Sequence, residues 1–406
     1  MQGLRDALRK LPETLEESYA IVYQQMMDCD ENAKLIAVHA INWLLCAKRQ
    51  LSSQEFLAAV TISCYGEQGG QSDNPLNTEE VLDICCNLIV LDKTVDMFRV
   101  AHLSVREYFE KRDEYGVPQL HTRALGACLD TLLAMPDLSF CTKLFYTCAS
   151  ACWAFHCAEL GDRRPEGVTG DKINEFLYNQ QYFLNWASNL QHSSSGFQEN
   201  QVMMLEDARD VSSAAVSPLF AACVFGFLWI MQDLEKRPDF AWDFVSDNGD
   251  SGLLLASKWG HIDIMRFLIN KGVDVAATQN LLSSETPLYF AIKNRHLESV
   301  LILLENGALV GARCWGMSNV KHAANCGHGG ILEAVLSYSR YTLKEWEASD
   351  LQIDKLDGLT DKLNEEIDWG FLGMGDLFPE KKEIDGSGTG ARMMDGDTLL
   401  EWLLLP

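Results

Sequence analysis

A unit of about 33 residues recurs four times in the C-terminal half of this 406-residue chain. In each unit an alanine stands five residues after a serine or threonine, and a glycine or arginine stands four residues after that alanine. The units begin at Ser217, Ser251, Thr286 and Ser318, which are 34, 35 and 32 residues apart. Four units in one register predict a stack of similar elements, because a unit of this length cannot bury a core alone.

The residue types within a unit predict two helices joined by a tight turn. In Thr286-Pro287, threonine can cap the first helix, and proline suits a first turn where an N–H would find no partner. The alanine lets two helices approach closely, and glycine permits the turn between them. The second helix carries an apolar stripe, such as Ile264, Phe267 and Leu268. Each unit is therefore expected to be a helix–turn–helix element.

The opening of the units resembles the T-P-L-H-x-A signature of ankyrin repeats, most closely at Thr286-Pro287-Leu288 with Ala291. That resemblance implies a helical solenoid of about four repeats over residues 212–343, with degenerate first and last units. Ankyrin repeats present a surface and carry no chemistry of their own. The sequence therefore favours a function in recognition over one in catalysis.

Composition narrows the class of partner and the compartment. The formal net charge of −25 argues against unaided binding to nucleic acid, because a phosphate backbone repels such a surface. The first ten residues have no apolar core of the kind a secretory signal needs. The 13 cysteines show no framework spacing, which indicates reduced thiols. We expect a cytoplasmic protein.

The apolar run from Ala214 to Met231 is about the minimum length for a membrane span, but its repeat register predicts a buried helix pair instead.

Residues 1–112 predict a small helical domain with one β-hairpin. Helical spacing is present over residues 15–26 and 33–47, and Ser52 with Glu55 forms a capping-box pattern before a third helix. Two apolar runs, residues 88–91 and 97–101, flank a short polar connection and predict the hairpin. A further helix is expected from about Ser104, with that serine as its cap. Helices followed by a hairpin and a helix is the order of a winged helix.

The N-terminal block also resembles a region of fungal NACHT–ankyrin proteins, which are NOD-like receptors of the STAND class. The most specific piece is the string from His102 to Phe109, which Ala101 precedes, and weaker pieces lie at residues 11–19, 40–45, 51–55, 121–128 and 151–156. In that family the region is a winged-helix domain, also described in proteins of the GPI inositol-deacylase type, and a helical linker follows it. The resemblance covers roughly residues 10–340. It implies the regulatory and sensor part of such a receptor.

One feature of that family is missing. The family carries a phosphate-binding loop, G-x-x-x-x-G-K-[ST], upstream of the winged helix, and this sequence contains no such loop. Nucleotide hydrolysis is therefore not expected of this chain. An NTPase module could lie in cis in a longer gene product or act in trans. A lipid hydrolase and a stand-alone ankyrin scaffold or adaptor are the alternatives.

Two further segments complete the predicted organisation. Residues 113–211 are expected to be a helical connector. Residues 344–406 hold 16 acidic and 6 basic side chains and include a Gly/Ser-rich spacer at residues 385–390, which predicts an acidic, poorly ordered tail. Near its end Leu400-Glu401-Trp402-Leu403-Leu404 could be a short helical docking motif, a further repeat or a chance apolar cluster.

Several patterns suggest chemistry but have simpler structural explanations. His102 and Ser104 suggest nucleophilic catalysis, yet no orienting acid is identifiable. The cluster Cys141, Cys148, Cys152, His156 and Cys157 fits a helical face better than a zinc knuckle, so core packing is expected. The predicted winged helix lacks a basic stripe for DNA. We therefore expect no catalytic, cofactor-binding or metal-binding residues.

The partner is expected to be a protein that binds the concave face formed by the first helices of the repeats and the tips of the loops between them. Tryptophan and arginine are the residues that most often anchor such interfaces. Ordinary solvated surface is the alternative for every candidate, and partial packing on the next repeat is a further one for Trp259. The candidates are Asp247, Asn248, Trp259, Asn280, Asn294, Arg313 and Trp315.

Overall fold

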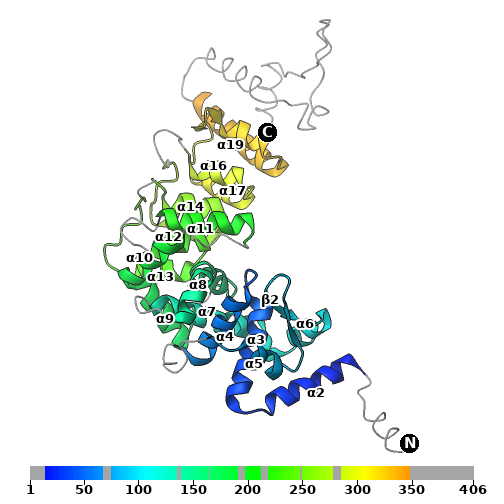
Figure 1. The fold of residues 1–406 in the computed structure, drawn as a ribbon. Coiled ribbons are helices and arrows are strands. Elements are labelled where there is room, and N and C mark those ends of the chain that lie inside the picture. Colours follow the sequence, from blue (N-terminus) through cyan, green and yellow to red (C-terminus); the bar gives the residue numbers. More distant parts are fainter. Residues whose placement is uncertain are drawn as a thin grey trace, which may run out of the picture. The chain divides into compact units, whose positions relative to one another are not determined.

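The computed structural model describes residues 14–66, 75–134, 139–162, 164–190, 197–211, 218–246, 249–277 and 285–347. These residues are mainly helical and include two small antiparallel hairpins (Figure 1), which confirms the predicted fold class. By packing, the chain divides into two compact units, Met1–Ala221 and Ala222–Pro406.

The first half of unit 1 has the predicted order of helices, hairpin and helix. The helices are α2 (Leu15–Met27), α3 (Glu31–Cys46), α4 (Ser53–Tyr65) and α5 (Thr78–Ile84). Strand β1 (Ile89–Asp92) pairs antiparallel with β2 (Met97–Val100), with Ile89 opposite Val100, and α6 (Leu103–Glu110) follows. The stacked rings of Phe56 and Phe98 join α4 to β2, with centroids 4.6 Å apart.

Of two helix caps predicted from the sequence in this half, the structure confirms one and contradicts the other. Ser52 and Glu55 form the predicted capping box, with each side chain bonded to the other residue's backbone N–H. The expected cap at Ser104 is wrong, because α6 begins one residue earlier, at Leu103. His102 is the cap instead: its Nδ1 accepts from the Ser104 N–H at 3.2 Å, as an imidazole lone pair can.

The second half of unit 1 packs onto the first. It comprises the 3-10 turn η1 (Asp113–Tyr115) and helices α7 (Val117–Leu133), α8 (Phe140–Ala158), α9 (Gly167–Tyr178), α10 (Gln180–Asn189) and α11 (Glu199–Val211). Helix α7 packs against α3 and α4, and α8 packs against α4 and α7. Asn42 Nδ2 donates to Leu120 O at 3.2 Å, and the Trp43 and Phe145 rings meet edge to face at 5.1 Å. The two halves therefore share one core, and a domain division at residue 112 stays a prediction.

The repeats form four consecutive helix pairs, with the boundary between the units inside the first helix. The pairs are α12 (Pro218–Phe225) with α13 (Leu228–Glu235), α14 (Gly252–Trp259) with α15 (Ile262–Asn270), α16 (Pro287–Lys293) with α17 (Leu297–Glu305), and α18 (Asn319–Asn325) with α19 (Gly329–Glu347). Ser251, Thr286 and Ser318 cap α14, α16 and α18 as predicted. Ser217, the fourth expected cap, lies outside the described residues.

Within unit 2 the first and second helices form two layers. Helix α14 packs against α16 and α16 against α18, while α13, α15, α17 and α19 pack in series beside them. The repeated alanines lie between the layers, and Ala222, Ala256, Ala291 and Ala323 are all buried. Helix α19 extends to Glu347, past the predicted repeat boundary at residue 343.

A histidine of each of two repeats lies against a glycine of the repeat before it. His261 Nε2 donates to Val224 O at 2.9 Å, and a Cβ added at Gly226 would lie 2.8 Å from the His261 ring. His296 Nε2 donates to Lys258 O at 3.1 Å, and a Cβ at Gly260 would lie 2.8 Å from His296 Nδ1. Both glycines have positive φ, so they serve the turn and the close approach together.

The third repeat junction lacks this arrangement. Arg295 stands where the earlier repeats have glycine, with φ of +62°, and its guanidinium lies beside Gly327. His328 Nδ1 instead accepts from the Ile331 N–H at 3.3 Å.

The apolar run up to Met231 forms two short buried helices, α12 and α13, in its described part. Among the described residues no helix is long and apolar enough to cross a membrane.

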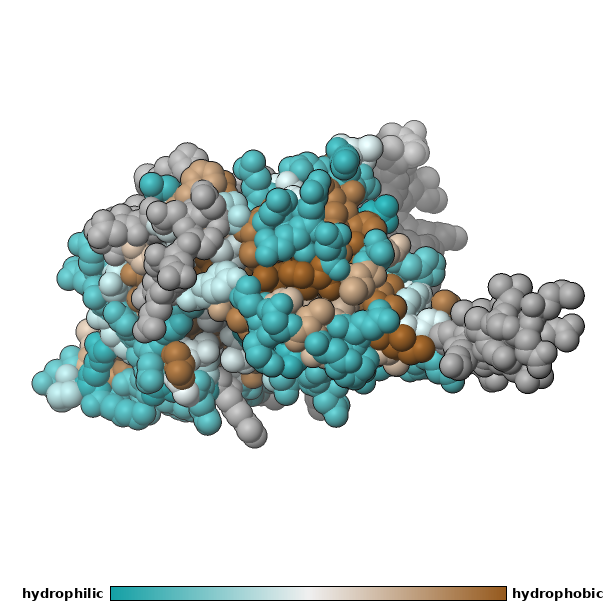
Figure 2. Space-filling view, turned by 60° about the horizontal axis from the view of Figure 1, so that its bottom comes forward, coloured by the Kyte–Doolittle hydropathy of each residue, from teal (hydrophilic) through white to brown (hydrophobic). Residues whose placement is uncertain are grey.

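Some large apolar side chains reach the surface of unit 1. Leu15 and Ile21 on α2 and Leu103 on α6 are 65%, 49% and 63% exposed. Figure 2 shows a face on which hydrophobic surface near the middle is bordered by hydrophilic residues.

Candidate partner-binding surface

The outward side chains of α14, α16 and α18 form one surface, here called the first-helix face. Most residues of these helices are buried, which leaves few side chains to solvent. Those that are half-buried or exposed, together with the C-cap of α16, are Lys258, Trp259, Lys293, Asn294, Lys321, His322 and Asn325. Because α14 packs on α16 and α16 on α18, these side chains lie along one side of the stack.

The first-helix face is basic in a strongly acidic protein. Each of its three helices carries one lysine and no carboxylate: Lys258 on α14, Lys293 on α16 and Lys321 on α18. The second helices, α13, α15, α17 and α19, carry eight carboxylates and three basic residues. Charge in the repeats is therefore divided between the two layers, and the first-helix face is the one suited to a negative ligand.

Two of these lysines lie over aromatic rings. Lys258 Nζ is 5.7 Å from the centroid of Trp259 and 5.3 Å from that of Phe290. Lys293 Nζ is 5.6 Å from the centroid of Tyr289 and 5.8 Å from that of Phe290. Cation–π contacts of this kind contribute about 0.5–1 kcal/mol each at exposed sites. They hold both ammonium groups close to these rings.

The aromatic residues beneath the lysines are part of the repeat core. Tyr289 and Phe290 are each 6% exposed and, with Leu254 and Cys314, form a cluster joining α14, α16 and the start of the last repeat. Burial, and then the nearby Glu285 carboxylate, raise the pKa of Tyr289, so its hydroxyl stays neutral. The rings are therefore a rigid platform rather than titrating groups.

The predicted partner-binding residues that the structure describes come from three elements of the repeats. Trp259 is half-buried at the end of α14 and lies on the first-helix face beside Lys258. Asn294 is half-buried, and its Nδ2 donates to Lys258 O at 2.8 Å, so its side chain joins α16 to α14. Arg313 and Trp315 belong to the small hairpin that precedes α18. Asp247, Asn248 and Asn280 lie outside the described residues.

Trp315 occupies the turn of the second hairpin. Strand β3 (Arg313–Cys314) pairs with β4 (Met317–Ser318), and both turn residues, Trp315 and Gly316, have positive φ. Such a turn favours Asn-Gly, and a bulky residue at positive φ is uncommon. Trp315 is 64% exposed, and its Nε1 donates to Glu285 Oε1 at 3.0 Å. A large ring is therefore held outward at the loop edge of the repeats.

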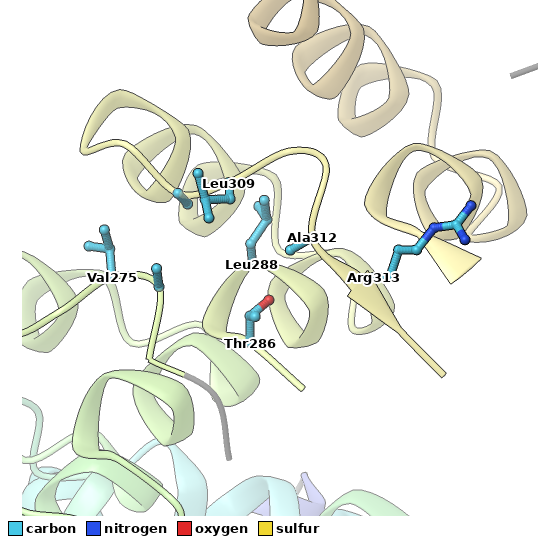
Figure 3. A pocket seen from close by; sticks show the side chains of 8 residues that line it. Val275, Thr286, Leu288, Leu309, Ala312 and Arg313 are labelled. Atoms are coloured by element: carbon cyan, nitrogen blue, oxygen red, sulfur yellow. The ribbon is translucent and has the colours of Figure 1, made fainter. Parts of the chain in front are cut away.

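A pocket of about 230 Å³ lies at the same loop edge. Figure 3 shows Val275, Leu288 and Leu309 directed toward a common space, with the guanidinium of Arg313 extending away from it. Leu309 is 64% exposed, which is unusual for a leucine beside a core. The remaining lining residues are Ala276, Thr286, Ala308 and Ala312. The pocket is mainly apolar and would suit an aliphatic or aromatic side chain of a peptide.

The patterns that suggested chemistry have structural roles in the described residues. Ser104 Oγ lies 2.7 Å from both His102 Nδ1 and the Tyr19 hydroxyl. In the part of the chain that the structure describes, no carboxylate accepts a hydrogen bond from His102. Cys141, Cys148, Cys152 and Cys157 are buried on α8 with His156, and no group of three or more metal-ligating residues gathers among the described residues.

Sequence reasoning missed the lysine row and the loop-edge pocket. A signal for the lysines was present, because Lys258 and Lys293 each stand two residues after the repeated alanine, and Lys321 stands two before it. The pocket had no comparable signal, since Val275 and Leu309 come from loops of different repeats.

Comparison with known proteins agrees with the two parts of the fold. Residues 219–314 match ankyrin repeats, in three copies, and residues 23–116 match the winged helix domain of GPI inositol-deacylase. Over 113 residues the chain is 30% identical to the ankyrin repeat protein FPV031 of Fowlpox virus (strain NVSL). That match covers 27% of this chain and 30% of the viral protein, so the chain spans about a third of that relative's length. The chain thus contains ankyrin repeats and a winged helix domain.

Proposed function

We propose that this chain is a non-catalytic recognition protein whose ankyrin repeats bind a protein partner on the first-helix face and the adjoining loop edge. The observation that carries this proposal is the arrangement on α14 and α16, where Lys258 and Lys293 lie over aromatic rings next to Trp259. Such a surface combines apolar area with positive charge, and it can bind a protein partner without a metal ion or cofactor. The exposed Trp315 and the pocket beside Leu309 extend it at the loop edge.

We further propose that the chain corresponds to the regulatory and sensor part of a fungal NACHT–ankyrin receptor and acts in the cytoplasm. The order of a winged helix domain followed by ankyrin repeats supports this proposal. In such a receptor the repeats would sense the ligand, and the winged helix would relay the bound state to an NTPase module supplied in cis or in trans. Genomic or transcript sequence upstream of Met1 provides the test, because a phosphate-binding loop encoded there would support the receptor and its absence would favour a scaffold.

A lipid hydrolase is the alternative suggested by the family name of the winged helix domain. The match covers that domain only, residues 23–116. A hydrolase needs a nucleophile, a base and an orienting acid within reach of one another. The closest approach to this in the described residues is the His102–Ser104 pair, which forms the cap of α6. Recognition is therefore the function that the structure supports better.

The test of the recognition proposal is an affinity measurement on tryptophan variants of the full chain. A partner captured by the wild type would be titrated by calorimetry against Trp259→Ala. We expect a loss of about 2 kcal/mol or more if Trp259 is a central anchor. Trp242→Ala is the matched control, because Trp242 packs on Phe267 of α15 in the second-helix layer, with ring centroids 5.1 Å apart. Unchanged affinity in a folded Trp259→Ala/Trp315→Ala variant would place the partner on another surface.

A further inference from the structure

The first-helix face and the C-terminal segment of the chain have complementary charge. The three helices of this face carry three lysines and no carboxylate. Residues 348–406, which follow α19 directly, contain 14 acidic and 5 basic side chains, a net charge of −9. The most basic face of the repeats and the most acidic segment of the sequence therefore belong to the same chain.

The segment also has the apolar residues that the face and the loop-edge pocket could bury. Trp369 and Phe371 follow four nearby carboxylates, Asp361, Glu365, Glu366 and Asp368. Trp402 and the three leucines after it follow Glu401. Acidic residues beside aromatic and aliphatic ones match a surface where Lys258 and Lys293 lie over rings and a mainly apolar pocket is near. An acidic segment lacking such residues would gain only screened electrostatic attraction from this face.

We propose that residues 348–406 bind the first-helix face of the same molecule and compete there with the external partner. Carboxylates of the segment would pair with Lys258, Lys293 and Lys321, and its aromatic or leucine side chains would cover Trp259 or enter the loop-edge pocket. This inference uses the surface of the proposed function, but the contact itself exists without any partner.

Tethering makes this occupant competitive even if each contact is weak. The segment directly follows α19, and α19 packs against α18, which carries Lys321. Its 59 residues could extend to about 200 Å at ~3.4 Å per residue, so reach does not limit it. A covalent link of this kind gives an effective concentration of about millimolar order for short linkers, falling as the linker lengthens. A partner must therefore outcompete a segment that is always present.

Zero-length cross-linking of the full chain tests the contact. A carbodiimide joins a carboxylate directly to a lysine Nζ that touches it, and peptide mapping identifies both residues. We expect residues 348–406 to cross-link to Lys258, Lys293 and Lys321 several-fold more often than to Lys236. Lys236 is the control because its side chain is 73% exposed at the end of a second helix, so random encounters would favour it. Equal yields at Lys236, or no cross-links from the segment, would overturn the proposal.

Isotope mixing separates the segment's own molecule from a second copy. Equal amounts of unlabelled and ¹⁵N-labelled chain would be cross-linked together. Pairs in which both peptides carry the same label support the proposal, whereas a statistical share of mixed pairs would show that the face binds another copy and would overturn it. About 0.5 M NaCl should reduce the cross-links to the three lysines, because ion pairs at a surface are screened.

Hydrogen exchange provides a second readout that needs no reactive lysine. In the full-length variant Lys258→Gln/Lys293→Gln/Lys321→Gln, amides of residues 348–406 should exchange faster than in the wild type. The matched control is Lys34→Gln/Lys111→Gln/Lys236→Gln, which removes the same charge away from the face and should leave those amides unchanged. Equal exchange in the two variants would exclude docking through the lysine row. Neither measurement involves a partner, so a failure here leaves the recognition proposal standing, and the reverse also holds.

Discussion

The Nδ1 atoms of His121 and His156 lie 2.8 Å apart in the core of unit 1 and join α7 to α8. Two imidazole nitrogens can share a hydrogen bond only if one donates and the other accepts, so at least one ring must be neutral. Burial lowers the pKa of His121 to about 4, and it lowers the pKa of His156 well below its usual value of 6.5. Burial also lowers the pKa of His39 to about 4.

These three histidines predict that unit 1 loses stability in mild acid. Below pH 6.5 the unfolded chain takes up protons that the folded chain does not bind until about pH 4. The free energy of unfolding therefore decreases as the pH is lowered from about 6.5 to about 4. Each group contributes up to about 1.4 kcal/mol per pH unit there. Thermal unfolding monitored between pH 7 and pH 5 should show a falling melting temperature.

A variant at His39 tests the assignment of this pH dependence. His39 Nδ1 is buried and has no hydrogen-bond partner among the residues that the structure describes, so His39→Met removes a titrating group without breaking a bond at that atom. The free energy of unfolding of the variant should depend less steeply on pH than that of the wild type. The difference in slope should correspond to about one proton bound per molecule on unfolding. An identical pH dependence would show that His39 is not held neutral in the fold.

Sequence predicted the features of the repeats that depend on local backbone geometry. Caps such as Thr286 and turn glycines such as Gly260 depend on a hydrogen bond or a φ value at one position. Their positions could therefore be predicted from the residue types alone. The pairing of His121 with His156 could not be, because it joins residues 35 apart through helix packing. The basic face was missed for the same reason, since only stacking shows that Lys258 and Lys293 share a surface.

The contact between Gly260 and His296 predicts unequal effects of two glycine substitutions. Both Gly260 and Gly272 have positive φ, which costs an alanine about 1–2 kcal/mol. A Cβ at Gly260 would also meet the His296 ring at 2.8–3.0 Å, whereas nothing lies within 4 Å of one at Gly272. Gly260→Ala should therefore be more destabilising than Gly272→Ala in urea unfolding. If the two cost the same, the histidine does not hold this junction.

The ion pair of Arg49 and Glu55 predicts how much stability unit 1 loses in each of three variants. Their side chains are only 6% and 19% exposed, and Glu55 also closes the capping box with Ser52. The pKa of Glu55 is lowered by its hydrogen bonds to Arg49 and to Ser52, which outweigh the opposing effect of burial. Ser52→Ala removes one cap bond and should cost about 1 kcal/mol.

Glu55→Gln should cost more, about 3–5 kcal/mol, because it leaves the Arg49 guanidinium buried without a counter-charge. The double variant Arg49→Met/Glu55→Gln should recover part of this loss, since the unpaired charge is gone. Denaturant unfolding of the three variants provides the measurement. A double variant less stable than Glu55→Gln alone would show that the guanidinium contributes through other contacts.

The stacking of the repeats predicts that damage to one helix spreads to its neighbours. Leu268 on α15 is fully buried, and α15 packs against both α13 and α17. Leu268→Ala should cost about 2–5 kcal/mol, as buried leucine truncations do. Because each repeat gains its stability from its neighbours, amides of α13 and α17 should exchange faster as well as those of α15. Leu309→Ala is the control, since Leu309 is 64% exposed and its truncation should leave exchange in these helices nearly unchanged. Faster exchange confined to α15 would contradict a cooperative stack and would imply that the repeats fold independently of one another.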